Sequence, residues 1–142
     1  MNVNKKERSK SQAEALSHQE RAIFTEIEIA MRKKKMYRNR TLSLEGLAKE
    51  LGVLRNTLSR VVNKCSGKNF CQYVNSYRIA EAVKLIVNRS KTGAKLQSIW
   101  RQVGFASRTP FYAAMKRNCN LSVAEISSDK RPKIKKKLHH TA

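Results

Sequence analysis

The sequence predicts an all-helical fold, and three observations support that prediction. Apolar residues recur every three or four positions along most of residues 17–127, which is the spacing of a helix face. Glycine is scarce, at 5 of 142 residues. No stretch alternates Val, Ile or Thr with polar residues between turn residues, as a strand would. Since 40% of the residues are apolar, the chain can bury a core, and we expect one folded domain at 17–127.

The two ends of the chain differ from this helical part. Residues 1–16 are polar and weakly patterned, and residues 128–142 form a basic run with little to bury. We therefore expect a flexible polar N-terminus and a flexible basic tail. Three interpretations of the tail stay open: a nonspecific DNA arm, a solubility segment, or a run resembling a nuclear-localisation signal.

The first half of the folded part contains three predicted helices. The first begins at Ser17, where an S-x-x-E capping box opens the helix, and ends in the basic run RKKKMYRNR. Ser43 caps a second, short helix that stops at Gly52. The third helix is expected over 55–64.

The second half begins with a long predicted helix at 69–89, which links the two halves. The stretch RSKTGAK after it is expected to be a loop. A further helix leads to Gly104, and Ser107 is a candidate cap for the helix that follows at 107–117. A last short helix opens at Ser122 through another S-x-x-E box.

The pattern of residues 43–65 returns at 96–118. Aligning Gly52 with Gly104 superimposes apolar positions on apolar positions in the flanking helices. In each copy a helix ends at a glycine, whose left-handed conformation can reverse the chain so that the next helix crosses steeply. This is the pattern of a helix-turn-helix, whose second helix can enter the major groove of DNA. The alternative is an ordinary helical hairpin.

The net charge of the chain limits the classes of partner that it can be expected to bind. With 31 Lys and Arg against 10 Asp and Glu, the formal net charge is +21, which attracts polyanions. Nucleic acid is the first partner to consider, anionic membrane the second, and a surface tuned for solubility is the plain alternative. Two helix-turn-helix copies on such a chain favour double-stranded DNA. A linker helix of about 20 residues spans on the order of 30 Å, close to one B-DNA turn of about 34 Å.

Four stretches resemble a known family in order and spacing: LAKELGVLRNTLSRVVNKCSGKNF, YVNSYRIAEAVKLI, VGFASRTPFYAAMKR and LSVAEI. Together they resemble the DNA-binding domain of the AraC/XylS transcription regulators over about residues 20–127. The resemblance implies a seven-helix domain with two helix-turn-helix motifs, at 43–65 and 96–118, joined by the linker helix at 69–89. It also implies binding of the two recognition helices in successive major grooves of promoter DNA, and recruitment or hindrance of RNA polymerase.

The resemblance also bears on location and on further domains. The family is mainly bacterial, so we expect a cytoplasmic, nucleoid-associated protein. Its members usually carry a separate sensor or dimerisation domain, and the residues before His18 are too few to form one. Two alternatives follow: a stand-alone short regulator, or the output end of a longer chain.

In the first motif the resemblance implies DNA contacts from one face of the recognition helix, at Arg55, Asn56, Thr57, Ser59 and Arg60. Arg60 can donate to guanine O6 and N7 and Asn56 can pair with adenine, each for about 1–3 kcal/mol of discrimination. The alternative for these side chains is phosphate contact or plain solvation. The residue before this helix is Leu54, where a Ser or Thr would cap it, an omission that costs about 1 kcal/mol.

The second motif offers fewer base-reading groups, at Arg108, Thr109, Tyr112 and Lys116. Trp100 stands where the first motif has Ala48, and an indole there would overpack the crossing unless the helices splay. Pro110 is tolerable only in the first turn after a cap at Ser107. We expect this motif to be intact as a fold and weaker as a reader of sequence.

The sequence gives little reason to expect an enzyme. The three histidines lie at or beyond the rim of the expected core, and no catalytic motif of known spacing occurs. The three cysteines, Cys65, Cys71 and Cys119, lack the close spacing that holds zinc, so we expect buried thiols, no metal and no cofactor. Arg78 and Glu81 are expected to form an ion pair on the linker helix.

The alternative function belongs to a different class from DNA binding. The first helix is amphipathic and ends in a basic run, so the chain is alternatively a membrane-surface or protein-interaction module without specific DNA readout. No run approaches the roughly 18 apolar residues that cross a bilayer. The beginning of the chain also lacks the apolar stretch of a signal peptide.

Overall fold

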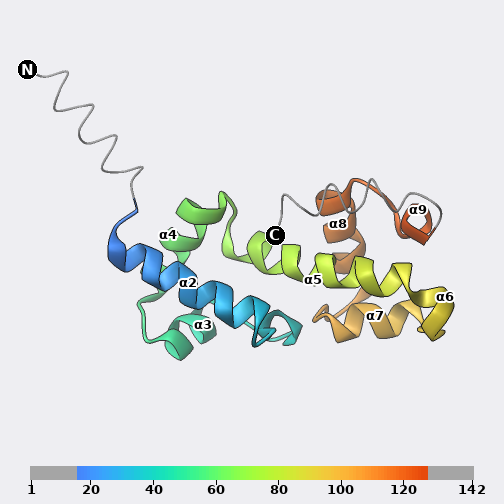
Figure 1. Ribbon diagram of the computed structural model, residues 1–142, viewed down its shortest axis with the longest axis horizontal. Coiled ribbons are helices and arrows are strands. Elements are labelled where there is room, and N and C mark those ends of the chain that lie inside the picture. The colour runs from blue at the N-terminus through green and yellow to red at the C-terminus, as the bar shows by residue number, and fades with distance from the viewer. Residues whose placement is uncertain (1–15, 128–142) are drawn as a thin grey trace, which may run out of the picture. The chain divides into compact units, whose positions relative to one another are not determined.

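The structure, a computed structural model, describes residues 16–127, and its regular elements are all helical (Figure 1). The predictions for the basic tail and for nearly all of the N-terminal segment lie outside the described residues. Helix labels follow Figure 1. The elements are α2 (His18–Arg32), the 3-10 turn η1 (Met36–Arg38), α3 (Leu44–Leu51), α4 (Arg55–Ser66), α5 (Phe70–Val87), α6 (Arg89–Thr92), α7 (Leu96–Gln102), α8 (Arg108–Cys119) and α9 (Val123–Ser127).

The prediction of an all-helical fold is confirmed, with two differences in detail. The described range holds eight α-helices, because α6 forms in the stretch that we expected to be a loop. The linker helix α5 ends at Val87, two residues before its predicted end. The backbone then passes through α6 to Gly93, which ends α6 with a φ of 69°.

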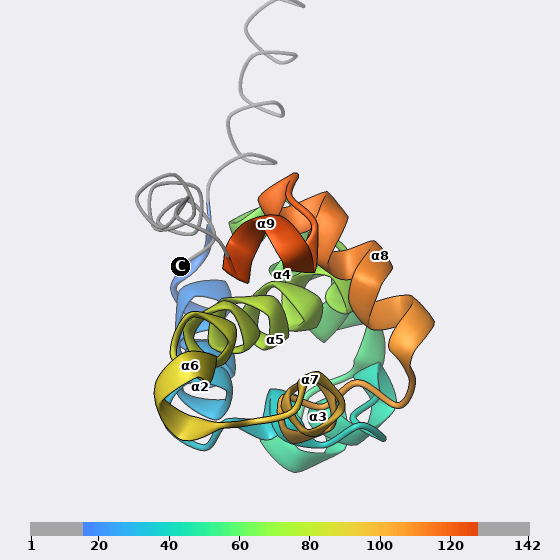
Figure 2. The same ribbon diagram turned by 90° about the vertical axis from the view of Figure 1, so that its right-hand side faces the viewer.

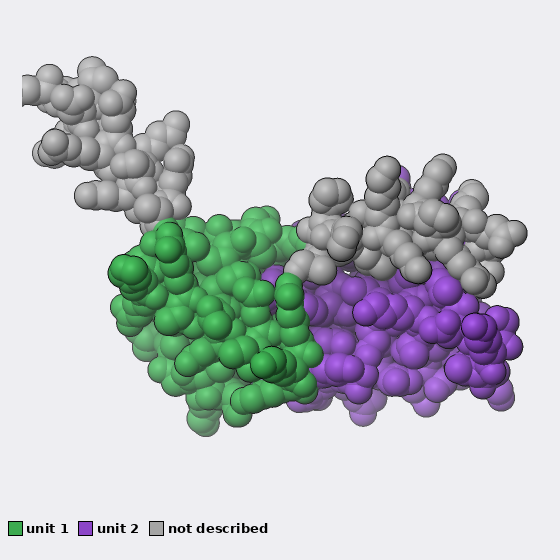
Figure 3. Space-filling model, viewed as in Figure 1, with its two compact units in different colours: residues 1–34, 43–70 green, residues 35–42, 71–142 purple. Residues whose placement is uncertain are grey.

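The chain divides into two compact units (Figure 3). Unit 1 consists of Met1–Lys34 and Ser43–Phe70, and unit 2 of Lys35–Leu42 and Cys71–Ala142. The first helix-turn-helix, α3 and α4, therefore belongs to unit 1, and the second, α7 and α8, belongs to unit 2.

In unit 1, α2 and α3 both pack against α4. The predicted capping box opens α2, since the Glu20 amide donates to Ser17 Oγ at 3.1 Å and the Ser17 amide donates to the Glu20 carboxylate at 3.2 Å. The Lys64 Nζ of α4 lies 3.4 Å from the same carboxylate. The buried apolar residues come from all three helices, at Ile23, Ile27, Ala30, Met31, Leu47, Ala48, Leu58, Val61 and Val62.

In unit 2, α7 lies on one side of α5 and α9 on the other (Figures 1 and 2). One apolar cluster joins these helices to α8, and its largest fully buried side chains are Ile79, Ile86, Ile99, Phe111, Met115 and Ile126. Trp100 belongs to the same cluster at 8% exposure, so the second motif buries the indole that sequence reasoning suspected of overpacking. The capping box of Ser122 opens α9 as predicted, with the Ser122 amide donating to Glu125 at 2.8 Å.

The segment after α2 has a structure that sequence reasoning missed. Lys35 takes the left-handed conformation at φ 51°, and the turn η1 follows it. Tyr37 is buried at 6% exposure and stacks on Tyr77 of α5, with 5.8 Å between ring centroids. Within unit 2, this segment therefore packs against α5.

The expected ion pair between Arg78 and Glu81 was wrong. Glu81 instead accepts hydrogen bonds from Arg38, one of them at 2.9 Å, and lies 3.9 Å from the Lys35 ammonium. The reason is that the turn η1 brings cations from outside the helix to Glu81. Sequence spacing along α5 could not reveal these partners.

These partners make the stability of unit 2 depend on pH. Burial raises the pKa of Glu81, but the hydrogen bonds and charge of Arg38, with the charge of Lys35, outweigh burial and hold the pKa below its ordinary value of 4.5. Glu81 therefore contributes stability above about that pH, and the contribution is lost as the pH falls through the lower pKa of the folded state. We expect Glu81→Gln to lower the unfolding free energy at about pH 7 and to have much less effect at about pH 3.

Denaturant titrations at the two pH values check this expectation. The exposed Glu26 of α2 provides a control, since Glu26→Gln removes a carboxylate that forms no ion pair with another of residues 16–127 and should change stability little at either pH. An equal loss for Glu81→Gln at both pH values would show that the carboxylate charge is not what stabilises the segment.

No helix among residues 16–127 is both long enough and apolar enough to cross a membrane.

Candidate nucleic-acid interface

The two predicted glycine turns share one backbone hydrogen-bond pattern. In the first, the Val53 amide donates to the Ala48 carbonyl at 3.0 Å and Gly52 has a φ of 68°. In the second, the Phe105 amide donates to the Trp100 carbonyl at 2.9 Å. Both bonds span five residues and close the last turn of a helix. The internal duplication read from the sequence is therefore present in the backbone.

The two glycines nevertheless serve different purposes. At Gly52 an added Cβ would meet nothing within 4 Å, so only its positive φ requires glycine. At Gly104, where φ is 110°, an added Cβ would lie 2.2 Å from the Tyr37 carbonyl oxygen and 2.8 Å from Arg78 Nε. The second turn needs glycine for its conformation and also for the close approach of the segment 35–42.

Arg78 lies where the segment 35–42 comes close to Gly104, and its partners differ from the one that the sequence suggested. Its Nε donates to the Tyr37 carbonyl at 2.7 Å, and its terminal nitrogens donate to the Asn39 carbonyl at 3.0 Å and to Asn75 Oδ1 at 3.3 Å. Its guanidinium also lies over the Phe105 ring, 5.6 Å from the centroid. Burial lowers the pKa of Arg78, but the group stays charged at neutral pH. It holds the segment 35–42 against α5 beside the second turn.

The recognition helix of the first motif, α4, has one buried and one exposed face. Leu58, Val61 and Val62 are completely buried, as expected for core positions. On the other face Arg55, Asn56 and Arg60 are exposed, while Thr57 and Ser59 are half-buried. The predicted site residues of this motif thus all have access to solvent.

Arg55 has a partner within unit 1. Its Nε lies 2.7 Å from a Glu45 carboxylate oxygen of α3, and both side chains are mostly exposed. The charge of Arg55 helps to hold the pKa of Glu45 below its ordinary value, after the larger effect of a backbone hydrogen bond. An exposed pair of this kind contributes little to stability, so Arg55 can exchange the carboxylate for another anion.

Leu54 precedes α4 without capping it. Its backbone is extended and no side chain accepts a hydrogen bond at this helix start. The leucine is 77% exposed. The sequence-based expectation of a missing cap is confirmed, and packing does not compensate for it.

Leu54→Ser should therefore stabilise the protein. A serine hydroxyl can accept from an amide of the first turn of α4, as Ser43 Oγ does from the Gly46 amide at 3.0 Å in α3. We expect a gain of about 1 kcal/mol, or roughly 4 °C in melting temperature. Leu54→Ala is the matched control, because it removes the same exposed side chain without supplying a cap. Equal melting temperatures for the two variants would contradict the capping argument.

The second recognition helix, α8, presents Arg108, Thr109 and Lys116 to solvent, with Tyr112 half-buried. The Arg108 guanidinium lies over the Tyr112 ring at 5.4 Å, and that ring meets Phe111 edge-on at 5.3 Å. Tyr112 thus packs partly against the core and partly against Arg108. Three of the predicted site residues are thus exposed on α8, as on α4.

Two expectations concern the start of α8, and one further observation concerns its end. Pro110 is its third residue, within the first turn, where proline is tolerated. Ser107 occupies the cap position but forms no capping hydrogen bond. Asn120 ends the helix at φ 54°, a left-handed conformation that asparagine adopts more readily than most residues.

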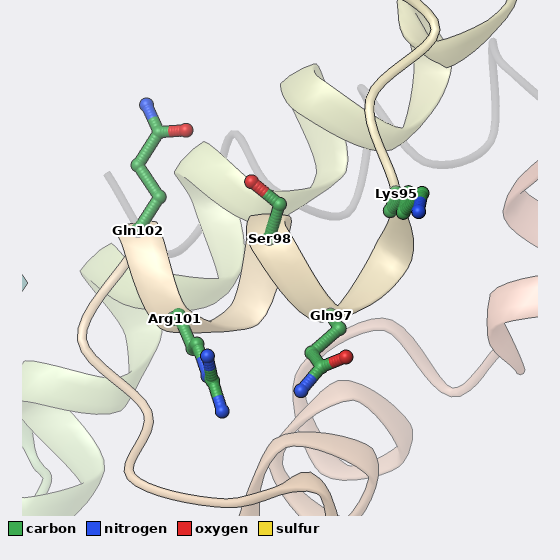
Figure 4. A pocket seen from close by; sticks show the side chains of 5 residues that line it. All are labelled: Lys95, Gln97, Ser98, Arg101 and Gln102. Atoms are coloured by element: carbon green, nitrogen blue, oxygen red, sulfur yellow. The ribbon is translucent and has the colours of Figure 1, made fainter.

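The outer surface of α7 carries a shallow recess of about 510 Å³ lined by Lys95, Gln97, Ser98, Arg101 and Gln102. Figure 4 shows Gln97 and Arg101 on one side of the helix and Ser98 and Gln102 on the other. All five side chains are exposed. They add two cations and several amide or hydroxyl groups to the first helix of the second motif, and such groups suit phosphate contacts.

The cysteines differ from the expectation that all are buried. Cys119 is buried, Cys65 is half-buried and Cys71 is exposed, because Cys71 lies in the first turn of α5 away from the apolar cluster. Burial raises the pKa of the Cys65 thiol. Among the described residues, no three His, Cys, Asp or Glu side chains gather as a metal site would require.

Comparison with known proteins decides the family. A helix-turn-helix domain family matches residues 47–128, which include most of the first motif, the linker helix and the whole second motif. The chain belongs to the AraC-type helix-turn-helix family. It is accordingly a DNA-binding protein of transcription regulation. Proteins of this family generally are not enzymes.

Solved structures share the fold of this AraC-type chain. The C-terminal domain of AraT, a response regulator from Geobacillus stearothermophilus, is 23% identical, with a TM-score of 0.62 over 81% of this chain and 92% of that one. The C-terminal domain of the two-component response regulator yesN from Fusobacterium nucleatum is also 23% identical, with a TM-score of 0.61 over 79% of this chain and 100% of that one. A Listeria innocua protein of unknown function is 18% identical, with a TM-score of 0.64 over 73% and 93%. No curated protein sequence matches.

Proposed function

We propose that this AraC-type protein is a sequence-specific regulator whose two recognition helices, α4 and α8, enter successive major grooves of promoter DNA. The observation that carries the proposal is the repeated turn, each copy followed by a helix with an exposed basic and polar face, on a chain of charge +21. The linker α5 has 18 residues, or roughly 27 Å at the usual rise per residue. That length is comparable with one turn of B-DNA.

In this proposal Arg55, Asn56, Thr57, Ser59 and Arg60 carry most of the base reading, and Arg108, Thr109, Tyr112 and Lys116 contribute mainly backbone affinity. The exposed amide and guanidinium groups of α4 suit bidentate contacts with adenine and guanine. Tyr112 is half-buried and packs against Arg108, which makes these two side chains less available to base edges. The protein acts in the cytoplasm at the nucleoid, where it recruits or hinders RNA polymerase.

Selection of bound duplexes from a random pool tests the proposal. A two-part motif with centres about ten base pairs apart is expected if both recognition helices read bases in adjacent grooves. A single short motif would limit sequence reading to α4. Recovery of no motif, together with binding to anionic liposomes, would overturn the proposal in favour of a membrane-surface module.

Arg60→Ala should relax sequence preference more than Arg108→Ala does. We expect Arg60→Ala to lose about 1–3 kcal/mol of discrimination at one position of the site. Arg108→Ala should weaken binding to all sequences more evenly and reduce the salt dependence of affinity. Binding titrations on a panel of single-base variants, each at several salt concentrations, measure both effects. Equal losses of discrimination in the two variants would be inconsistent with the assignment of reading to α4.

A further inference from the structure

Leu54 is an exposed leucine at the base-reading end of α4. It is 77% exposed, whereas Ile29, the other large apolar residue exposed within residues 16–127, is 40% exposed. Arg55 and Asn56, the next two residues, are exposed and polar. One aliphatic side chain therefore stands in solvent among the groups proposed to read bases.

The folded protein gains little from a leucine at this position. The side chain makes no substantial packing contact, as its exposure shows, and it cannot cap α4. Elsewhere the same chain uses serine for this purpose, at Ser17, Ser43 and Ser122, and each of these hydroxyls accepts the capping hydrogen bond. Leu54 therefore lowers the stability of its own helix without a compensating contact inside the protein.

A role in DNA recognition accounts for the position. The first residues of a recognition helix lie near base edges in the major groove. There the thymine 5-methyl group is the apolar feature that distinguishes T from C, and aliphatic side chains contact it. We propose that Leu54 contacts the 5-methyl group of one thymine and selects T at that position of the binding site. This inference rests on the proposed function of α4 as a reader.

Replacement of thymine by uracil tests the contact, because uracil lacks only the 5-methyl group. Each thymine of a selected duplex is replaced in turn, and the affinity of the full chain and of Leu54→Ala is measured by fluorescence anisotropy. At one thymine the wild-type affinity should fall by about fourfold, the value of one buried methyl group. Leu54→Ala should bind the two duplexes equally, within about twofold.

Three variants serve as controls. Leu54→Ser, which should fold more stably, must also lose the uracil effect, so that a damaged fold cannot explain the loss. Leu54→Met must retain part of the effect, because it keeps an apolar side chain. Arg60→Ala must bind less selectively yet remain sensitive to uracil at the same thymine.

The inference can fail separately from the proposed function. If a defined site is selected but no thymine shows a uracil effect that depends on Leu54, the inference is overturned and sequence-specific binding stands. If no site is selected at all, the proposed function is overturned and the inference with it.

Discussion

Gly104→Ala should destabilise the protein far more than the corresponding change in the first motif, Gly52→Ala. An alanine Cβ at Gly104 would lie 2.2 Å from the Tyr37 carbonyl oxygen, which is a backbone atom, and 2.8 Å from Arg78 Nε. A backbone atom cannot turn away as a flexible side chain does, so the segment 35–42 must shift or detach. We expect a loss of about 3 kcal/mol or more, which lowers the melting temperature by roughly 12 °C.

Gly52→Ala provides a matched control for backbone conformation. Its positive φ makes alanine unfavourable by about 1 kcal/mol, but its Cβ would meet nothing within 4 Å. Thermal unfolding of both variants, followed by circular dichroism, separates the cost of conformation from the cost of the clash. Similar losses at the two glycines would mean that the segment 35–42 moves aside easily, contrary to this account.

Arg78→Lys should also destabilise the protein, although it keeps the positive charge. Arg78 donates to the Tyr37 and Asn39 carbonyls and to the Asn75 side chain at the same time. A lysine ammonium on a flexible stem cannot reproduce this planar fork. At about 1 kcal/mol for each net hydrogen bond, we expect a loss of about 2–3 kcal/mol.

The half-buried Arg89 of α6 is the control for this substitution. Its Nε donates to the Ala94 carbonyl at 3.2 Å, a local contact five residues away. Arg89→Lys should change stability by no more than about 0.5 kcal/mol. Denaturant titration of the two variants measures the difference in unfolding free energy. Equal losses would show that the hydrogen bonds to the segment 35–42 stabilise the protein no more than the local contact of Arg89 does.

Neither Gly104→Ala nor Arg78→Lys follows from sequence spacing alone. The helix starts at Ser17, Ser43 and Ser122 could be predicted because a cap and the amide that it satisfies lie within three residues of each other. Likewise, the turn at Gly52 depends on local conformation. The two carbonyl partners of Arg78 lie 41 and 39 residues away, and no helical period relates residues at such separations.

The difference between contacts of near neighbours and contacts of distant residues also explains which site features could be predicted from the sequence. The exposed face of α4 could be predicted because the apolar positions 58, 61 and 62 define the opposite face by their spacing. The half-burial of Tyr112 could not, because it depends on the apolar cluster of unit 2, against which the side chain packs. The ion pair of Glu81 was assigned to the wrong arginine because Arg38 approaches from a separate turn.

By itself, the sequence determined the all-helical class, the repeated helix-turn-helix, the missing cap at Leu54 and the strong positive charge. These features depend on interactions between near neighbours or on composition, which remain the same however the helices pack. The tertiary structure alone decided that Gly104 must be glycine for want of space and that Arg78 binds the segment 35–42. It also decided that Trp100 is accommodated in the core. These features depend on contacts between residues far apart in the chain, and such contacts exist only once the helices have packed.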